Sequence, residues 1–208
     1  MRQFLTDFVT LLVVVNPISK LSIFLAVTGG QSPKHQRAIA LRATLIAFGI
    51  LLFFIVCGQI LLGALSISLD SFRIAGSLVL LLFGLQMVFN TVPRPAPDMQ
   101  GLDPSDTELA VFPLAVPAIA GPGAMLAVVV LTDNDQFTIL EQAQTAATLA
   151  LVLLITWGAM RFAAPLLKLI RPAGASIIAR VMGLILASLA VNGMVRAVIA
   201  IVQGASRG

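Results

Sequence analysis

The residues best suited to bind a ligand lie in the middle of an apolar segment near the N-terminus. Asn16 and Pro17 are followed by Ser19, Lys20 and Ser22, with runs of apolar residues on either side. Proline has no backbone N–H, and its ring clashes with the carbonyl four residues back, so a helix kinks or breaks there. The amide, hydroxyl and ammonium groups beside such a break can hydrogen-bond a small polar solute. We predict that these five residues form part of a binding site.

A second break is expected in a later apolar segment. Pro113, Pro117 and Pro122 are accompanied there by Gly121 and Gly123, a composition that opposes a continuous helix. Each break offers a half-helix N-terminus, which suits a carboxylate, and a half-helix C-terminus, which suits an ammonium. A small zwitterionic amino acid matches both, and we predict that Pro117 and the residues Gly121, Pro122 and Gly123 contact it. The alternative is that the prolines only kink helices for packing.

The chain that must position these residues is dominated by apolar segments. Of its 208 residues, 59% are hydrophobic and 11% are charged, whereas soluble domains carry about 25% charged residues. A membrane-spanning helix needs about 20 predominantly apolar residues, and the period-two alternation of a membrane barrel is absent. We predict an all-α polytopic membrane protein with six transmembrane helices, of which the first and fourth are broken. The predicted spans are 4–28, 41–65, 71–90, 109–131, 143–166 and 177–202.

The two halves of the chain can be aligned with each other. Asn-Pro at 16–17 matches Gly-Pro at 121–122, and Arg-x-x-Gly at 73–76 matches Arg-x-x-Gly at 180–183. The two offsets, 105 and 107 residues, are nearly equal, although chance similarity between apolar sequences is the alternative. Because each half has three spans, the second half is inverted, and inverted repeats bind substrate near the bilayer midplane. The predicted divisions are a first repeat at 1–92, a cytoplasmic linker at 93–108 and a second repeat at 109–208.

The distribution of basic residues among the loops predicts the orientation, because Lys and Arg accumulate in cytoplasmic loops. Lys34 and Arg37 lie between the first two spans and Lys168 and Arg171 between the last two, whereas the loop at 66–70 has no basic residue. Both termini are therefore expected on the periplasmic side of a bacterial inner membrane.

Charged residues inside the spans are few. A lysine at the bilayer centre costs ~2.5–3.5 kcal/mol, so Lys20 either contacts a substrate carboxylate or extends to the interface. No carboxylate lies in the middle of a span, and Asp7 lies near the end of the first. We therefore expect that transport, if it is coupled, uses sodium, exchange or downhill efflux rather than a buried acid.

Four further polar residues are secondary candidates for the site. Arg73 and Arg180 lie near span ends, where arginine side chains commonly reach the lipid headgroups. Gln86 and Asn192 lie within the third and sixth spans. These two either line a cavity or form hydrogen bonds between helices, as polar residues in membrane helices do.

Several function classes lack support in the sequence. Cys57 is the only cysteine, so no disulfide can form within the chain, and the single histidine, His35, cannot alone build a metal site. No phosphate-binding or dinucleotide-binding motif is present, and the basic residues are too dispersed for a nucleic-acid site. We expect no cofactor, no metal and no enzymatic activity. The expected partners are the lipid bilayer and a small solute, and a homo-oligomer is left open.

Four sequence motifs carry a resemblance to a known family. They are Asn-Pro-Ile at 16–18 with Ile-Phe at 23–24, Phe-Arg-Ile-Ala-Gly at 72–76, Phe-Pro-Leu-Ala-Val-Pro-Ala-Ile-Ala-Gly-Pro-Gly at 112–123 and Arg-Val-Met-Gly-Leu-Ile-Leu at 180–186. The chain resembles the MarC family, also called the small neutral amino-acid transporter family, over nearly its whole length. The resemblance implies a six-helix inner-membrane protein, in a family of which some members carry glycine, alanine and similar amino acids.

The chain departs from the family pattern beside the first break. Ser19, Lys20 and Ser22 stand where relatives usually have a Gly-Asn-x-Pro stretch, and Asn16 stands where relatives often have an aspartate. Asn16 cannot carry a proton, and Lys20 replaces a neutral residue. The predicted function is secondary transport, in the export direction, of small neutral amino acids by alternating access. A lipid translocase and a non-transporting membrane assembly protein are the alternatives.

Overall fold

The protein is a bundle of helices. The computed structural model describes residues 2–89, 105–134 and 137–205, and this part of the chain contains no strand. Its elements are α1 (Arg2–Val15), α2 (Pro17–Thr28), α3 (Pro33–Ala64), α4 (Leu69–Phe89), α5 (Asp106–Leu109), the π-helical segment η2 (Ala110–Ile119), α6 (Pro122–Leu131), α7 (Ile139–Arg161) and α8 (Ala163–Ala205). Most of the predicted linker at 93–108 lies outside the described residues.

The lengths and composition of the helices confirm a polytopic membrane protein. Five described segments are long and apolar enough to cross a membrane: Gln3–Thr28, Pro33–Ala64, Leu69–Phe89, Ile139–Arg161 and Ser176–Gly204. The bent pair Asp106–Ile119 and Pro122–Leu131 adds a sixth if it forms one span. The breaks fall in the first and fourth of these spans, as the sequence predicts.

Two helices are longer than the apolar pattern indicates. α3 begins at Pro33 rather than at residue 41 because Ser32 caps it, accepting a hydrogen bond from the His35 N–H at 3.4 Å. The predicted sixth span is likewise only part of α8, which has 43 residues. The additional turns contain polar residues, so a search for apolar runs omits these turns although the helix continues through them.

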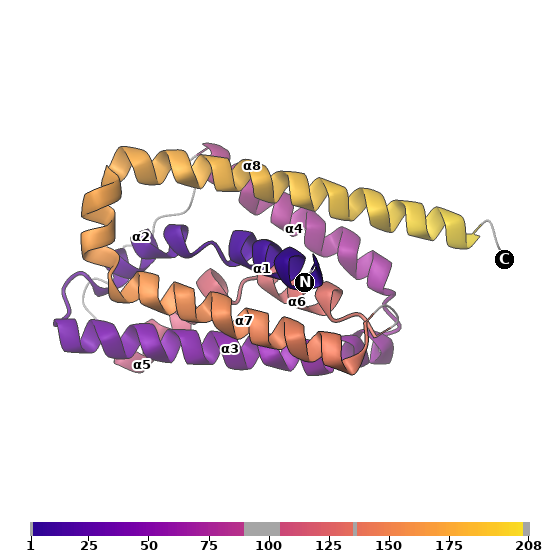
Figure 1. Ribbon diagram of the computed structural model, residues 1–208, viewed down its shortest axis with the longest axis horizontal. Helices are drawn as coiled ribbons and strands as arrows, with labels where there is room; N and C mark the ends of the chain where they lie inside the picture. Colours follow the sequence, from indigo (N-terminus) through magenta and orange to yellow (C-terminus); the bar gives the residue numbers. More distant parts are fainter. Residues whose placement is uncertain (1, 90–104, 135–136, 206–208) are drawn as a thin grey trace.

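The bundle has three layers (Figure 1). α4 and α8 pack together on one side, and α3 and α7 pack together on the other. Between them lie the two broken segments, with α1 against α6 and α2 against η2. Fully or almost fully buried core residues occur in both broken segments, among them Leu11, Val15, Leu21, Leu114 and Ile119. Both breaks therefore lie in the middle layer, which the other helices cover.

α4 and α8 approach each other through glycines. A Cβ atom on Gly84 would lie 2.8 Å from the Gly183 carbonyl oxygen, and one on Gly183 would lie 2.7 Å from the Gly84 carbonyl oxygen. Farther along, a Cβ atom on Gly193 would lie 2.6 Å from Ser77 Oγ. Small residues allow such backbone contact between membrane helices. The third span packs against the sixth, the second against the fifth and the first against the fourth. A two-fold axis between the halves would produce the same pairs, but the inverted repeat itself stays a prediction.

Candidate functional site

The first break consists of one residue, Asn16, in the left-handed conformation. Its φ and ψ are 49° and 73°, a region that asparagine tolerates better than most other residues with a Cβ. The Asn16 N–H still donates to the Leu12 carbonyl at 2.9 Å, which completes α1. Pro17, which has no N–H to donate, then begins α2. The Asn-Pro pair therefore interrupts the helix at the predicted position.

The Asn16 side chain closes this break from within. Its Oδ1 accepts a hydrogen bond from the Ser19 N–H at 3.3 Å, and the Ser19 hydroxyl donates to the Asn16 carbonyl at 2.9 Å. Its Nδ2 lies 3.9 Å from Met87 Sδ of α4, and the residue is 5% exposed. The polar groups of Asn16 and Ser19, which we predicted would bind a ligand, are thus hydrogen-bonded within the protein, and Asn16 is the N-cap of α2.

The second break lacks such a cap. η2 departs from helical geometry at Phe112 and Val116, the residues that precede its two prolines. α6 then begins at Pro122, with Gly121 in the N-cap position and no side-chain cap. The segments on either side of this break differ in direction by 58°. The N-terminal turn of α6 is therefore the better of the two half-helix ends for binding an anionic group.

The two breaks lie next to each other. A Cβ atom on Gly123, in the first turn of α6, would lie 3.5 Å from Val14 Cγ1 and 2.3 Å from Leu80 Cδ2 of α4. Val14 lies only two residues before Asn16, so the end of α1 touches the beginning of α6. The structure therefore brings the two predicted halves of the site together within the middle layer.

The predicted binding residues differ in accessibility. Asn16, Pro17 and Gly123 are buried, Ser19, Lys20 and Gly121 are partly buried, and Ser22, Pro117 and Pro122 are exposed. The buried members of this set shape the breaks and pack them against neighbouring helices. The partly buried and exposed members are the ones whose atoms a solute can reach without displacing protein.

Lys20 lies in the second turn of α2, which packs against η2, α7 and α8. Within the described residues no carboxylate forms an ion pair with its ammonium; the ion pairs there involve His35 and Arg73. An intramembrane cation faces a partner, a cavity or the interface. Lys20 therefore remains a candidate for contact with a ligand carboxylate.

A polar cluster that the sequence did not predict joins three helices at one end of the bundle. The Arg73 guanidinium contacts the Asp70 and Asp133 carboxylates, each at 3.1 Å, and only 19% of its side chain is exposed. The Gln59 amide donates to the Thr132 carbonyl at 3.3 Å and to Asp133 at 3.4 Å. Arg73 is thus held within the protein, whereas the sequence suggested that it reaches the lipid headgroups. The 60-residue separation of Arg73 and Asp133 explains why no local pattern indicated this pair.

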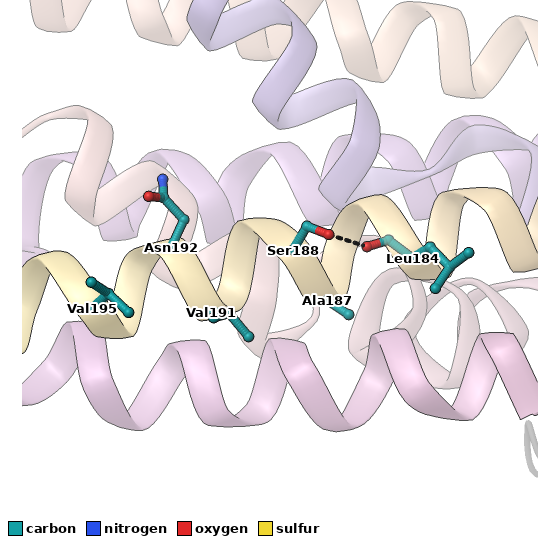
Figure 2. Close-up of a pocket in the computed structure, with 6 residues that line it drawn as sticks. All are labelled: Leu184, Ala187, Ser188, Val191, Asn192 and Val195. Carbon is teal, nitrogen blue, oxygen red and sulfur yellow. Dashed lines mark hydrogen bonds between the residues drawn. The ribbon is translucent and has the colours of Figure 1, made fainter.

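The other secondary candidates are scattered. Arg180 is exposed and Gln86 is partly buried. Asn192 lines a groove of about 520 Å³ along one face of α8, together with Leu184, Ala187, Ser188, Val191 and Val195. Figure 2 shows Asn192 and Ser188 on the same side of the helix, where the Ser188 hydroxyl donates to the Leu184 carbonyl at 2.9 Å. Asn192 therefore belongs to a surface separate from the two breaks.

Asp7 is a buried residue near the end of the first span, which the sequence analysis did not include among the candidate site residues. It is 1% exposed and accepts a hydrogen bond from the Thr145 hydroxyl at 2.7 Å. One sequence signal was available: Gln3 and Asp7 stand four residues apart on α1, and Thr145 and Thr148 stand three apart on α7. Such spacings place polar side chains on one helix face.

Comparisons with known proteins agree with this architecture. A model of the MarC family, described as integral membrane proteins, matches residues 1–202. A UPF0056 membrane protein of Archaeoglobus fulgidus is 33% identical over 190 residues, covering 91% of this chain and 89% of the relative. The inner membrane protein YhgN of Escherichia coli K12 is 30% identical over 194 residues, covering 91% and 93%, and the inner membrane protein MarC of an E. coli O1:K1 strain is 27% identical over 206 residues, covering 94% and 93%. No solved structure gives a significant match.

Proposed function

We propose that this chain, which belongs to the MarC family of integral membrane proteins, is a secondary transporter that exports small zwitterionic amino acids such as glycine and alanine. The observation that carries the proposal is the contact between two broken spans: the end of α1 meets the start of α6 at the Val14–Gly123 contact, inside the layer covered by the other helices. Secondary transporters bind their substrates at such interruptions, because backbone polar groups are available there and nowhere else in an apolar span.

The two breaks offer complementary groups to a zwitterion. The uncapped N-terminus of α6 and the ammonium of Lys20, which forms no ion pair with another described residue, both favour a carboxylate. The Val13 carbonyl lacks its usual donor, because Pro17 has no N–H, and it favours an ammonium group. Small residues surround the second break, including Ala118, Ala120 and Gly121. The solute in this proposal is therefore a small amino acid, and the chain performs no covalent chemistry on it.

Movement in this proposal follows from the inverted repeat. One half, 1–92, rocks against the other, 109–208, and opens the site first to one side of the membrane and then to the other. In this proposal both termini lie in the periplasm of a bacterial cell, an orientation that the distribution of basic residues favours.

The test is flux of labelled glycine and alanine in proteoliposomes that contain the purified protein. Hydrogen bonds to charged groups contribute about 1.5–3 kcal/mol, so Lys20→Met should raise the half-saturating concentration at least about tenfold. Lys168→Met, which removes an exposed lysine, should leave it unchanged. Absence of amino-acid flux in the unaltered protein at any concentration would overturn the proposal.

The groove on α8 favours a second candidate function, lipid translocation. It is an open surface lined by residues of α8, most of them apolar, and the exposed Arg180 stands one turn before Leu184. Arg73, the other arginine expected to flank such a groove, is held by carboxylates instead. Fluorescent-lipid exchange between the leaflets, lost in Arg180→Gln and unaffected by Lys20→Met, would support this candidate over the first.

A further inference from the structure

Asp7 and Thr145 form a buried polar pair between the two halves of the chain. Asp7 is 1% exposed and belongs to the candidate membrane span Gln3–Thr28. The Thr145 hydroxyl of α7, which is 0% exposed, donates to Asp7 Oδ2 at 2.7 Å. Leu5 and Val9 of α1 are exposed whereas Asp7 is buried, so Asp7 lies on the face of α1 that packs against α7 (Figure 1).

No cation neutralises the Asp7 carboxylate within the described residues. None of the ion pairs there involves Asp7. On α1 itself, Asp7 is the only charged residue after Arg2, and Lys20 follows on α2 beyond the break. Gln3, one turn before Asp7, has a buried Nε2 without a hydrogen-bond partner, and this neutral amide supplies no countercharge.

The helices that pack against α1 supply no countercharge either. α6 contains no titratable residue, and Asp133, which follows it, is held by Arg73. On α7, the Glu141 carboxylate accepts hydrogen bonds from Thr138, and Arg161 lies at the opposite end of the helix. On α8, Arg196 is exposed, as are Lys168 and Arg180.

The Asp7 carboxylate can lose its charge by binding a proton. Burying an ionised carboxyl group without a cation is costly, and a single hydroxyl donor offsets only part of that cost. Binding a proton removes the charge and leaves the group able to donate as well as accept. Ionisable residues inside membrane spans are accordingly rare and tend to serve in ion or proton pathways.

We propose that Asp7 is a proton-binding site and that its protonation is coupled to movement of the solute. The coupling rests on the proposed transport function, whereas proton binding does not. α1 leads directly into the first break, and α7 belongs to the other half of the chain. A rocking movement of the halves would therefore open or close the Asp7–Thr145 contact and change the affinity of Asp7 for the proton.

The hydrogen bonds around Thr145 can satisfy both forms of Asp7. When Asp7 is ionised, the Thr145 hydroxyl donates to it at 2.7 Å. When Asp7 takes a proton from the aqueous phase, its own O–H donates to Thr145 Oγ1, and the Thr145 hydroxyl turns to the Glu141 carbonyl, 3.2 Å away. Only hydroxyl hydrogens move in this exchange, and the bound proton is released to water when the contact opens.

Infrared difference spectroscopy of the reconstituted full-length protein tests proton binding without reference to transport. Lowering the pH should produce the C=O band of a protonated carboxylic acid that is absent from Asp7→Asn, shifted in Thr145→Val because one hydrogen bond is lost, and retained in Asp106→Asn. Asp106, which contacts His35 instead, is the matched control. An unchanged band in Asp7→Asn, or a band that responds to sodium instead of pH, would overturn the proposal.

Flux measurements then test the coupling. In the unaltered protein a pH gradient should drive accumulation of labelled alanine. Asp7→Asn, which mimics the protonated form, should exchange alanine across the membrane but lose the gradient-driven accumulation at least tenfold. Equal gradient-driven accumulation in both proteins would refute the coupling. Absence of any flux in the unaltered protein would refute the proposed function, and the infrared result would still decide whether Asp7 binds a proton.

Discussion

Replacing Gly123 with alanine tests whether the second break must pack tightly against α4. The added methyl group would lie 2.3 Å from Leu80 Cδ2, 3.1 Å from Leu80 Cγ and 3.5 Å from Val14 Cγ1. Leu80 is 7% exposed, so its side chain has little space into which it can turn. α6 also packs tightly against α3 and α4 elsewhere along its length. A Cβ atom on Gly58 of α3 would lie 2.6 Å from Val129, and one on Gly76 of α4 would lie 2.6 Å from Leu126.

The expected cost of Gly123→Ala follows from this overlap. Overpacking a filled interior costs about 1–3 kcal/mol, which corresponds to about 5–150-fold in an equilibrium constant. The higher helix propensity of alanine returns at most about 1 kcal/mol, and less in a first turn than in a helix interior. We therefore expect a net destabilisation of about 1–2 kcal/mol, together with a loss of flux, because α4 and α6 must separate at Leu80 to admit the methyl group.

A double-mutant cycle with Leu80→Ala isolates the contact. Unfolding in a graded mixture of mild and denaturing detergent gives the relative stabilities, and labelled alanine gives the flux. Leu80→Ala alone removes packing, but it also clears the space that the Gly123→Ala methyl needs, so the double variant should be more stable than the sum of the single changes by about 0.5–3 kcal/mol. Additive effects, or a Gly123→Ala protein with unaltered stability and flux, would refute the argument that α6 and α4 are in tight contact beside the second break.

Three further predictions follow from contacts elsewhere in the bundle. Gly84→Ala should destabilise by about 1–3 kcal/mol because its Cβ would meet backbone atoms of α8, whereas Gly49→Ala, with nothing within 4 Å, should be neutral or stabilising in the same unfolding assay. Arg73→Met should cost about 3–5 kcal/mol because it leaves the Asp133 carboxylate buried without its cation, and Asp133→Asn in the same chain should recover part of that loss. Asn16→Gly should cost only a few tenths of a kcal/mol, because glycine keeps the left-handed conformation, while Asn16→Ala should cost about 1–2 kcal/mol; equal losses would contradict the assignment of Asn16 as an N-cap.

The breaks were predictable because their cause is local. A proline removes one hydrogen-bond donor wherever it stands, so Pro17 and Pro122 indicate the beginning of a new helical segment without knowledge of the fold. The groups that cap the helix after each break were harder to predict. Asn16 turns its own side chain onto the Ser19 N–H, whereas Gly121 has no side chain to do so, and this difference makes the second break the more open one.

The polar contacts between distant segments were not predictable in this way. Asp7 lies near the end of the span Gln3–Thr28, as predicted, but its burial depends on α7, which begins more than a hundred residues later. Asp133 lies just beyond the predicted fourth span, and the packing of α4 against α6 brings Arg73 to it. Both contacts join residues far apart in the sequence, so no local pattern indicates them.

The Arg73 cluster makes the two ends of the bundle unequal, even if the halves prove to be related by a two-fold axis. Under that relation Arg180 corresponds to Arg73, and the end of α2 at Thr28–Gly30 corresponds to Asp133, yet those three residues contain no carboxylate and Arg180 is exposed. Opening the end near Arg73 must break the contact between Arg73 and the buried Asp133 at 3.1 Å. The charged contact at the opposite end, between His35 and Asp106, is more exposed and so contributes less. The conformation closed at the Arg73 end should therefore predominate at rest. Asp133→Asn should then increase the reactivity of a cysteine placed at the neighbouring Thr132, which is 2% exposed, toward a membrane-impermeant thiol reagent. Unchanged reactivity in Asp133→Asn, measured in a Cys57→Ala background, would show that the cluster does not hold that end closed.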